Sequence, residues 1–186
     1  IGDYAFKGAT SLISIGWNKI QTIGSYSFSE CLGLTSLRFG NDVKTINSHA
    51  FESCSKLSEI DLNKVEILNE YAFYNCSSIS ILTISENVKQ IHENAFTETN
   101  LTSISFGGIY EPNPCHELSF DEDIIEVNVL DNYTGSDFCG IEIKKMGSCG
   151  KDCSYTYDGT QHLLEIIGGT MDDWKSQNEI EGNQCK

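Results

Sequence analysis

One apolar pattern returns five times between residues 1 and 106, at intervals of 22 or 23 positions. It reads I-G-x-x-S-F-x-x-C-x-x-L-x-x-L-x-F over residues 23–39 and I-x-x-x-A-F-x-x-C-x-x-L-x-x-I-x-L over residues 46–62. A fixed period of this length is typical of a solenoid, in which each copy forms one coil and successive coils stack. Solenoids mostly act through the surface that they present. We therefore expect the functional site to be a binding face rather than a catalytic centre.

The repeated positions form columns that predict the core. An aliphatic residue begins each copy and an aromatic residue follows five positions later: Ile1 and Phe6, Ile23 and Phe28, Ile46 and Phe51, Leu68 and Phe73, Ile91 and Phe96. A single coil buries too little apolar surface to offset the entropy of ordering its backbone. Each coil must therefore be completed by its neighbours, which also pair its strand edges.

The spacing within one copy predicts the local structure. The L-x-x-I-x-F stretch alternates at its end, which indicates a short strand, and the V-x-x-I stretch, as at residues 43–46, indicates a second extended segment. Between them, A-F-x-x-C-x-x-L spaces its apolar residues at three, which suits one turn of 3₁₀ or α-helix. The predicted fold class is α/β: a right-handed solenoid of repeats, dominated by strands, with an irregular C-terminal capping coil and an appended β-hairpin.

The pattern changes after residue 106. The strand positions continue in register at Ile124, Val127 and Val129, but the leading and aromatic columns are lost in a segment that holds both prolines, Pro112 and Pro114. We predict five repeats over residues 1–106, an irregular sixth coil and cap over 107–145, and a β-hairpin module over 146–174. The polar residues 175–186 are expected to form a flexible tail.

Charge limits the possible partners. The chain has 12 basic and 27 acidic residues, for a net charge of −15, so nucleic acids and anionic lipids would be repelled at long range. No apolar run reaches the roughly 18–20 residues that span a bilayer. Because the chain enters inside a copy and has no initial Met, we expect it to be a fragment of a longer protein.

The five copies resemble the BspA-like leucine-rich repeat family, whose pattern is I-G-x-x-A-F-x-x-C-x-x-L-x-x-I-x-L/F. The match departs where Ala9 and Thr99 replace the cysteine, and where one residue is missing between Phe96 and Leu101. The resemblance implies a surface-exposed protein of bacteria or protists. It also implies adhesion to host proteins, such as those of the extracellular matrix, or to other cells.

The eight cysteines fall into two groups. Cys31, Cys54 and Cys76 occupy one repeat column, where a small apolar side chain packs well; Ala9 and Thr99 in sister coils favour packing over a metal or disulfide role. The remaining five lie outside the regular array.

Four of these outlying cysteines are disulfide candidates if the chain is extracellular: Cys115, Cys139, Cys149 and Cys153. Cys115 with Cys139 would tie the irregular coil to its cover. Cys149 and Cys153 could pair locally, or one of them could reach Cys185. Connectivity cannot be read from the sequence alone.

The sequence contains no motif for catalysis, a cofactor or a metal. The four histidines lie in different coils and modules, no nucleophile recurs with them, and no glycine-rich phosphate loop appears. The acidic run at 121–123 lacks the loop of a calcium site and is interpreted as solvated. We predict a protein that is not an enzyme and has no cofactor and no metal. Asn132 and Asn100 are glycosylation candidates, since each begins an N-x-T sequon.

The outward positions of the strands form the candidate binding face. Most are small and hydroxylated, with one charged cluster and one bare aliphatic residue, and the candidates are Ser36, Arg38, Glu59, Asp61, Ile81 and Thr83. A plain solvated sheet is the alternative.

The leading hypothesis for function is a cell-surface protein-binding or adhesion module, extracellular in location. One alternative is an intracellular scaffold of the same fold with all cysteines reduced. Another is a carbohydrate-active parallel β-helix, for which Glu59 and Asp61 are the only hint.

Overall fold

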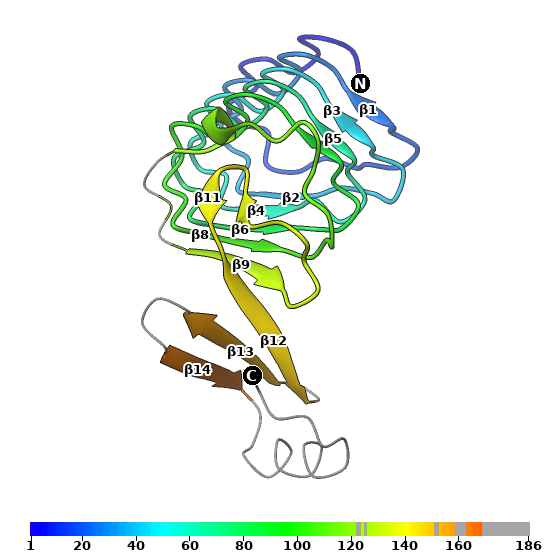
Figure 1. The fold of residues 1–186 in the computed structure, drawn as a ribbon. Coiled ribbons are helices and arrows are strands. Elements are labelled where there is room, and N and C mark those ends of the chain that lie inside the picture. Colours follow the sequence, from blue (N-terminus) through cyan, green and yellow to red (C-terminus); the bar gives the residue numbers. More distant parts are fainter. Residues whose placement is uncertain (122–123, 125, 151–152, 159–162, 169–186) are drawn as a thin grey trace.

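The chain forms a stack of coils from which a three-stranded extension projects (Figure 1). The structure, a computed structural model, describes residues 1–121, 124, 126–150, 153–158 and 163–168. The coils follow one another along a common axis, and the last coil carries the extension at the C-terminal end of the described chain.

The L-x-x-I-x-F stretches pair in parallel along one side of the stack. The strands are β2 (Ser36–Arg38), β4 (Glu59–Asp61), β6 (Ile81–Ile84), β8 (Ser103–Phe106) and β9 (Glu126–Leu130). β2 pairs with β4 in one sheet, and β8 lies between β6 and β9 in a second sheet, so that β4 and β6 are not paired. Residues 12–17 of the first coil are not assigned as a strand. The predicted strands are confirmed from the second coil onward.

A second parallel sheet runs along another side of the stack. It consists of the two-residue strands β1 (Thr22–Ile23), β3 (Thr45–Ile46), β5 (Ile67–Leu68) and β7 (Gln90–Ile91), in the order β1-β3-β5-β7. The leading column residues are direct partners, as in the pairs Ile23–Ile46 and Ile46–Leu68. The second extended segment expected from the V-x-x-I stretch is thus confirmed.

The third side of each coil is a run of turns, and the helical turn predicted there is wrong. In each of the first five coils, the residues two positions before and after the column Phe have positive φ, as at Tyr26 (56°) and Glu30 (63°) around Phe28. A helix requires negative φ throughout, so it cannot propagate through these positions. The only helix among the described residues is the 3₁₀ helix η1 (Glu117–Ser119) in the sixth coil.

Backbone amides on this turn side alternate between two partners. The amides of Tyr26, Phe28 and Glu30 donate to carbonyls of the next coil, at 3.2, 2.8 and 2.8 Å. The intervening amides, such as those of Ser27 and Ser29, donate to the carbonyl three residues earlier in their own coil. The positive-φ residues produce this alternation, so that every second amide donates a hydrogen bond to a carbonyl of the next coil.

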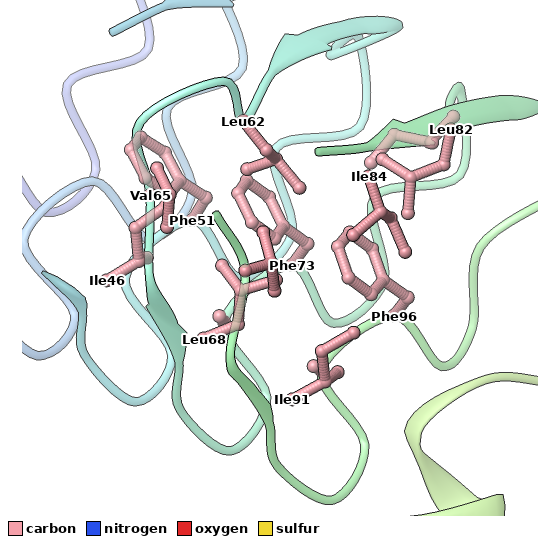
Figure 2. Packing of buried hydrophobic residues seen from close by; sticks show 14 of the residues in the cluster. Ile46, Phe51, Leu62, Val65, Leu68, Phe73, Leu82, Ile84, Ile91 and Phe96 are labelled. Carbon is pink, nitrogen blue, oxygen red and sulfur yellow. The ribbon is translucent and has the colours of Figure 1, made fainter. Parts of the chain in front are cut away.

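The aromatic column forms the centre of the core. Successive rings from Phe6 to Phe96 stack with centroids 5.2–5.3 Å apart and planes within 8° of parallel. From the second coil onward these rings are fully buried. Figure 2 shows Phe51, Phe73 and Phe96 in a row, each accompanied by the leading aliphatic residue of its own coil. The column predicted from the repeat is confirmed.

The sixth coil retains more of the pattern than the sequence suggested. Val127 and Val129 pair with Ile104 and Phe106, as expected from the strand register. The leading and aromatic columns, however, are not lost. Cys115 takes the position of the leading aliphatic residue, and its backbone forms a parallel β-bridge with Ile91. The Phe120 ring stacks on the Phe96 ring, with centroids 5.5 Å apart.

The cap and the extension follow β9. A small antiparallel pair, β10 (Asp137–Phe138) and β11 (Ile141–Glu142), precedes β12 (Lys144–Gly150), which pairs in parallel with β9. Strands β13 (Cys153–Asp158) and β14 (Leu163–Gly168) continue the same sheet in antiparallel pairing. The predicted boundary between residues 145 and 146 therefore falls inside β12. The predicted tail at 175–186 lies outside the described residues.

Truncating one ring of the aromatic column should destabilise the whole stack. Phe51 is fully buried between Phe28 and Phe73, so Phe51→Ala leaves a cavity in the core and should lower the free energy of unfolding by about 3–5 kcal/mol. Urea unfolding followed by circular dichroism measures this change. The control Ile81→Ala removes a side chain that is 67% exposed and should cost less than about 0.5 kcal/mol. Equal costs for the two variants would contradict the stacked core.

Candidate functional site

The predicted strand-face residues of β2 and β4 lie in register on paired strands. Ser36 is the direct partner of Glu59, and Arg38 is the direct partner of Asp61. Along β6 the exposed positions Ile81 and Thr83 alternate with the buried Leu82 and Ile84. Because neighbouring strands lie about 4.8 Å apart, equivalent outward residues of successive coils form rows.

The exposed part of this face is centred on β2, β4 and β6. On β8 the outward residues Ser103 and Ser105 are half-buried, and on β9 the outward Asn128 is buried. Five of the six candidates are therefore exposed, whereas Ser36 is half-buried like the serines of β8. This gradient could not be derived from the repeat, since every coil contributes an equivalent outward position.

One ion pair forms on the face. The Arg38 guanidinium lies 3.6 Å from the Glu59 carboxylate, and their side chains are 80% and 68% exposed. Such exposed pairs contribute about 0–1 kcal/mol, so either group can exchange its partner at little cost. The Asp61 carboxylate instead accepts a hydrogen bond from the Asn63 amide at 2.9 Å, which orders the turn after β4.

The repeat-column cysteines are free, buried thiols, as predicted. Cys31, Cys54 and Cys76 each donate an S–H hydrogen bond to a Phe carbonyl of the preceding coil, at 3.1–3.2 Å. Burial raises the pKa of the Cys31 thiol to about 11 and also raises the pKa of the Cys76 thiol. The sequence predicted their packing, whereas the hydrogen bond to the neighbouring coil becomes visible only once the coils are stacked.

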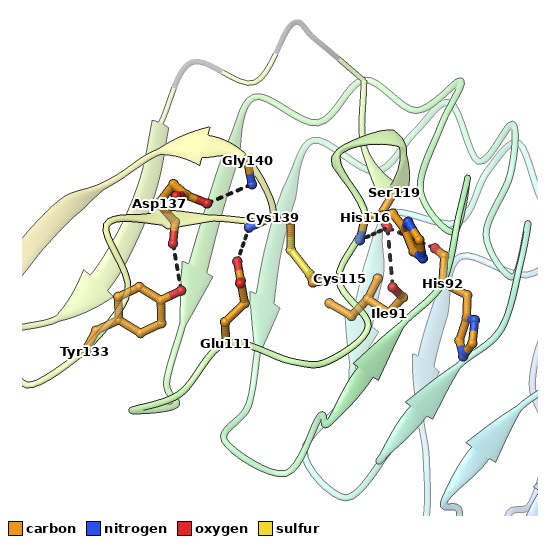
Figure 3. The surroundings of a disulfide bond; sticks show 10 residues. All are labelled: Ile91, His92, Glu111, Cys115, His116, Ser119, Tyr133, Asp137, Cys139 and Gly140. Carbon is orange, nitrogen blue, oxygen red and sulfur yellow. Dashed lines mark hydrogen bonds between the residues drawn. A yellow bond between two sulfur atoms is a disulfide. The ribbon is translucent and has the colours of Figure 1, made fainter.

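Cys115 and Cys139 form a disulfide, with Cα atoms 5.1 Å apart, and this predicted pair is confirmed. Figure 3 shows the bond joining the sixth coil to the cap segment. The Glu111 carboxylate accepts a hydrogen bond from the Cys139 amide beside it. The side chains of Cys149 and Cys153, and all of Cys185, lie outside the described residues.

Two polar contacts order the cap around the disulfide. The Tyr133 hydroxyl donates to the Asp137 carbonyl at 2.7 Å, and the Gly140 amide donates to the Asp137 carboxylate at 3.0 Å (Figure 3). Burial, with the nearby carboxylates of Glu111 and Asp137, raises the pKa of Tyr133 to about 12. Tyr133 therefore remains a neutral hydrogen-bond donor at neutral pH.

The described histidines lie in separate places and do not form a catalytic or metal-binding cluster. His49 stacks between Tyr26 and Tyr71, with ring centroids 4.4 and 4.7 Å apart. The Nδ1 atom of His92 lies 3.7 Å from a carboxylate oxygen of Glu70. The described residues contain no group of three or more histidine, cysteine or acidic side chains suited to a metal ion.

The stack around His49 was missed by the sequence analysis. Tyr4, Tyr26, His49 and Tyr71 form a ladder on the turn side, with every pair of neighbouring rings within 5° of parallel. Each of these residues stands two positions before the column Phe. This constant offset was the available signal, although the mixture of Tyr and His obscured it.

The remaining predicted sites have separate surroundings. Asn132 and Asn100 are both exposed, and the Asn100 side-chain amide donates to the Ser77 carbonyl at 2.7 Å. Asp121 was interpreted as part of a solvated acidic run. Its carboxylate instead accepts hydrogen bonds from the amides of Glu98 and Thr99, both at 3.0 Å. Within the described residues, no helix has the length and hydropathy to cross a bilayer.

The profile of a family described as "BspA type Leucine rich repeat region (6 copies)" matches residues 1–111. No curated protein matches the chain. Among solved structures, the fold is similar to the crystal structure of a leucine-rich repeat protein from Bacteroides ovatus, with 20% identity and a TM-score of 0.47. The match covers 80% of this chain and 42% of that one, so the chain spans less than half of that protein.

Stacked coils with an ordered, accessible strand face define a repeat-built solenoid of the protein-interaction class. The chain belongs to the BspA-type leucine-rich repeat family. This family and fold are typical of scaffolds without catalytic activity.

Removing the disulfide should destabilise the cap. The bond closes a loop of sequence separation 24, so the double variant Cys115→Ser, Cys139→Ser should lose about 3 kcal/mol of stability. Calorimetry should show a lower Tm, and a reductant should lower the wild-type Tm more than that of the variant. Thiol titration of the denatured, unreduced chains should give equal counts for both. Two additional thiols in the wild-type chain would show that the bond does not form.

The stability of the stack should also depend on pH through Glu70. The Ser48 hydroxyl donates to the Glu70 carboxylate at 2.8 Å, and this bond is the largest cause of the lowered pKa of Glu70. The ionised carboxylate therefore stabilises the folded chain above its unfolded pKa of about 4.5, and this contribution is lost as pH falls through the lower folded pKa.

Ser48→Ala should raise the pKa of Glu70 and reduce stability at neutral pH more than at pH 3. Carbon-detected NMR titration gives the pKa, and urea unfolding at both pH values gives the stability. Ser58→Ala is the matched control, since Ser58 donates to the Thr35 carbonyl and not to a carboxylate. An unchanged Glu70 pKa in Ser48→Ala would contradict this assignment.

Proposed function

We propose that the chain is a cell-surface module that binds proteins through the strand face of β2, β4 and β6. The observation that carries this proposal is the set of exposed side chains on these strands: β2 and β4 lie in register, Arg38 and Glu59 form a loose ion pair, and Ile81 on β6 is 67% exposed. A rigid stack holds these side chains at fixed spacing. A protein partner can therefore contact several coils at once.

The composition of the face suits adhesion by many weak contacts. Small hydroxylated residues allow close approach, Ile81 supplies apolar area, and Arg38 and Glu59 supply both charge signs. No single contact needs to be strong, because display of many copies on one surface multiplies weak affinities. Host extracellular matrix and other cell surfaces are the proposed partners.

The disulfide supports an extracellular location. Structural disulfides persist in oxidising compartments and are rare in the cytosol. In the alternative, an intracellular scaffold, Cys115 and Cys139 would be reduced and the cap would lose its covalent attachment to the sixth coil. The Cys115–Cys139 bond therefore favours the surface proposal.

Substitution on the face should weaken binding without unfolding the chain. We expect the double variant Arg38→Ala, Glu59→Ala to bind a reconstituted extracellular-matrix preparation about three- to tenfold more weakly, since it removes two rim charges. Immobilised matrix and surface plasmon resonance provide the measurement, and an unchanged Tm confirms folding.

The matched control is the double variant Lys56→Ala, Glu98→Ala. It removes one positive and one negative charge from exposed residues outside the strand face, so it should bind like the wild type. Wild-type binding by the strand-face variant, or equal losses in both variants, would overturn the proposal for this face.

A further inference from the structure

A groove opens between the turn after β6 and the segment after β8, and none of the strand-face candidates lines it. Its volume is about 490 Å³, and one wall is the turn after β6 while the other is the segment after β8. The residues that define its chemistry are Glu86, Lys89, Ile109, Tyr110 and Glu111. This volume lies within the range typical of ligand sites, about 300–1,000 Å³.

The groove forms because the segment after β8 is longer than the equivalent segment after β6. Phe106 and Cys115 are nine positions apart, whereas their partners Ile84 and Ile91 are only seven apart. The longer segment is tied to the previous coil at both ends, by Gly107 N–H to the Ile84 carbonyl at 2.9 Å and by Asn113 N–H to the Lys89 carbonyl at 2.7 Å. The residues between these ties must therefore bulge outward.

The bulge places two large side chains at the surface. Val88, which follows β6, is 2% exposed, whereas Ile109, which follows β8, is 42% exposed and Tyr110 is 74% exposed. Gly108 permits this departure, because a Cβ there would overlap the Phe106 ring.

The cap holds the bulge from its other side. The amide and hydroxyl of Thr134 both donate to the Ile109 carbonyl, at 3.0 and 3.2 Å. The Glu111 carboxylate accepts from the Cys139 amide (Figure 3). This wall of the groove is therefore ordered before a ligand binds, so binding costs little further conformational entropy of the protein.

The charges of the groove favour a cation. The Lys89 ammonium lies 2.9 Å from the Glu66 carboxylate, which also pairs with the Lys44 ammonium at 2.9 Å, so the charge of Lys89 is compensated only in part. Glu86 and Glu111 are exposed acids on opposite walls, and Glu86 has no ion-pair partner among the described residues. The net charge of −15 adds a long-range attraction for basic partners.

We propose that this groove binds an arginine side chain of a protein partner. A guanidinium group can stack on the exposed ring of Tyr110 while it donates to the carboxylate of Glu86. The exposed side chain of Ile109, which lines the groove, suits the methylene stem of the same side chain. The site is separate from the strand face and does not depend on the function proposed for that face.

The test uses two probe peptides that differ only in charge. One is an acetylated, amidated pentapeptide of alternating glycine and arginine, and the other has citrulline, the neutral isostere, at the arginine positions. NMR titration of the full chain at low salt should give a dissociation constant on the order of 1 mM for the arginine peptide. The citrulline peptide should bind at least about tenfold more weakly.

Variants separate the groove from general charge attraction. Tyr110→Ala and Glu86→Gln should each weaken binding about three- to tenfold, while Tyr110→Phe retains the ring and should bind like the wild type. Glu98→Gln removes the same charge from an exposed residue outside the groove lining and is the matched control.

Three outcomes would overturn the proposal: equal binding of both peptides, wild-type binding by Tyr110→Ala, or equal losses in Glu86→Gln and Glu98→Gln. The strand-face double variant Arg38→Ala, Glu59→Ala should bind the arginine peptide normally. This last result distinguishes failure of the groove from failure of the strand face.

Discussion

The alternation of backbone hydrogen bonds on the turn side is the constraint on which the structure depends. If this segment were a helix, the amides beyond its first turn would bond within the coil and would not reach the neighbouring coil. Positive φ at Tyr26 and Glu30, and at their equivalents in other coils, directs every second amide toward a carbonyl of the next coil. Successive coils are then tied by these turn bonds and by the sheet of β1, β3, β5 and β7, and the strand-face pairs β2–β4, β6–β8 and β8–β9 add a third connection where they form.

The aromatic column and the cysteine column follow from this arrangement. Bonds between adjacent turns bring each Phe directly over the next, with ring centroids 5.2–5.3 Å apart. The same spacing brings each column thiol within reach of a Phe carbonyl in the preceding coil. A side chain with a weak donor and small volume suits this position, because a larger group would separate the coils.

The parts predictable from the sequence were those that repeat with the period. Phe28, Phe51 and Phe73 could be assigned to one column because their spacing is constant, and the outward positions Arg38 and Ile81 followed from period-two alternation. The disulfide of Cys115 with Cys139 was predictable because both residues fall where the regular array ends.

Features that depend on contacts between coils were not predictable. Phe120 lies 24 residues after Phe96, outside the regular spacing, yet its ring completes the column. The helical turn was expected because spacing at three does not distinguish a helix from alternating turns. The groove beside Tyr110 depends on a two-residue excess that matters only because both of its ends are tied to the preceding coil.

Amide hydrogen exchange tests the alternating turn bonds most directly. The amides of Phe28, Phe51 and Phe73 are expected to exchange slowly and at similar rates. Each is buried and donates a hydrogen bond to the next coil, so it can exchange only when the coils separate. The amide of the exposed Lys56, on a turn of the third coil, should exchange much faster. Exchange of the Phe51 amide as fast as that of Lys56 would contradict the claim that these bonds hold the stack together.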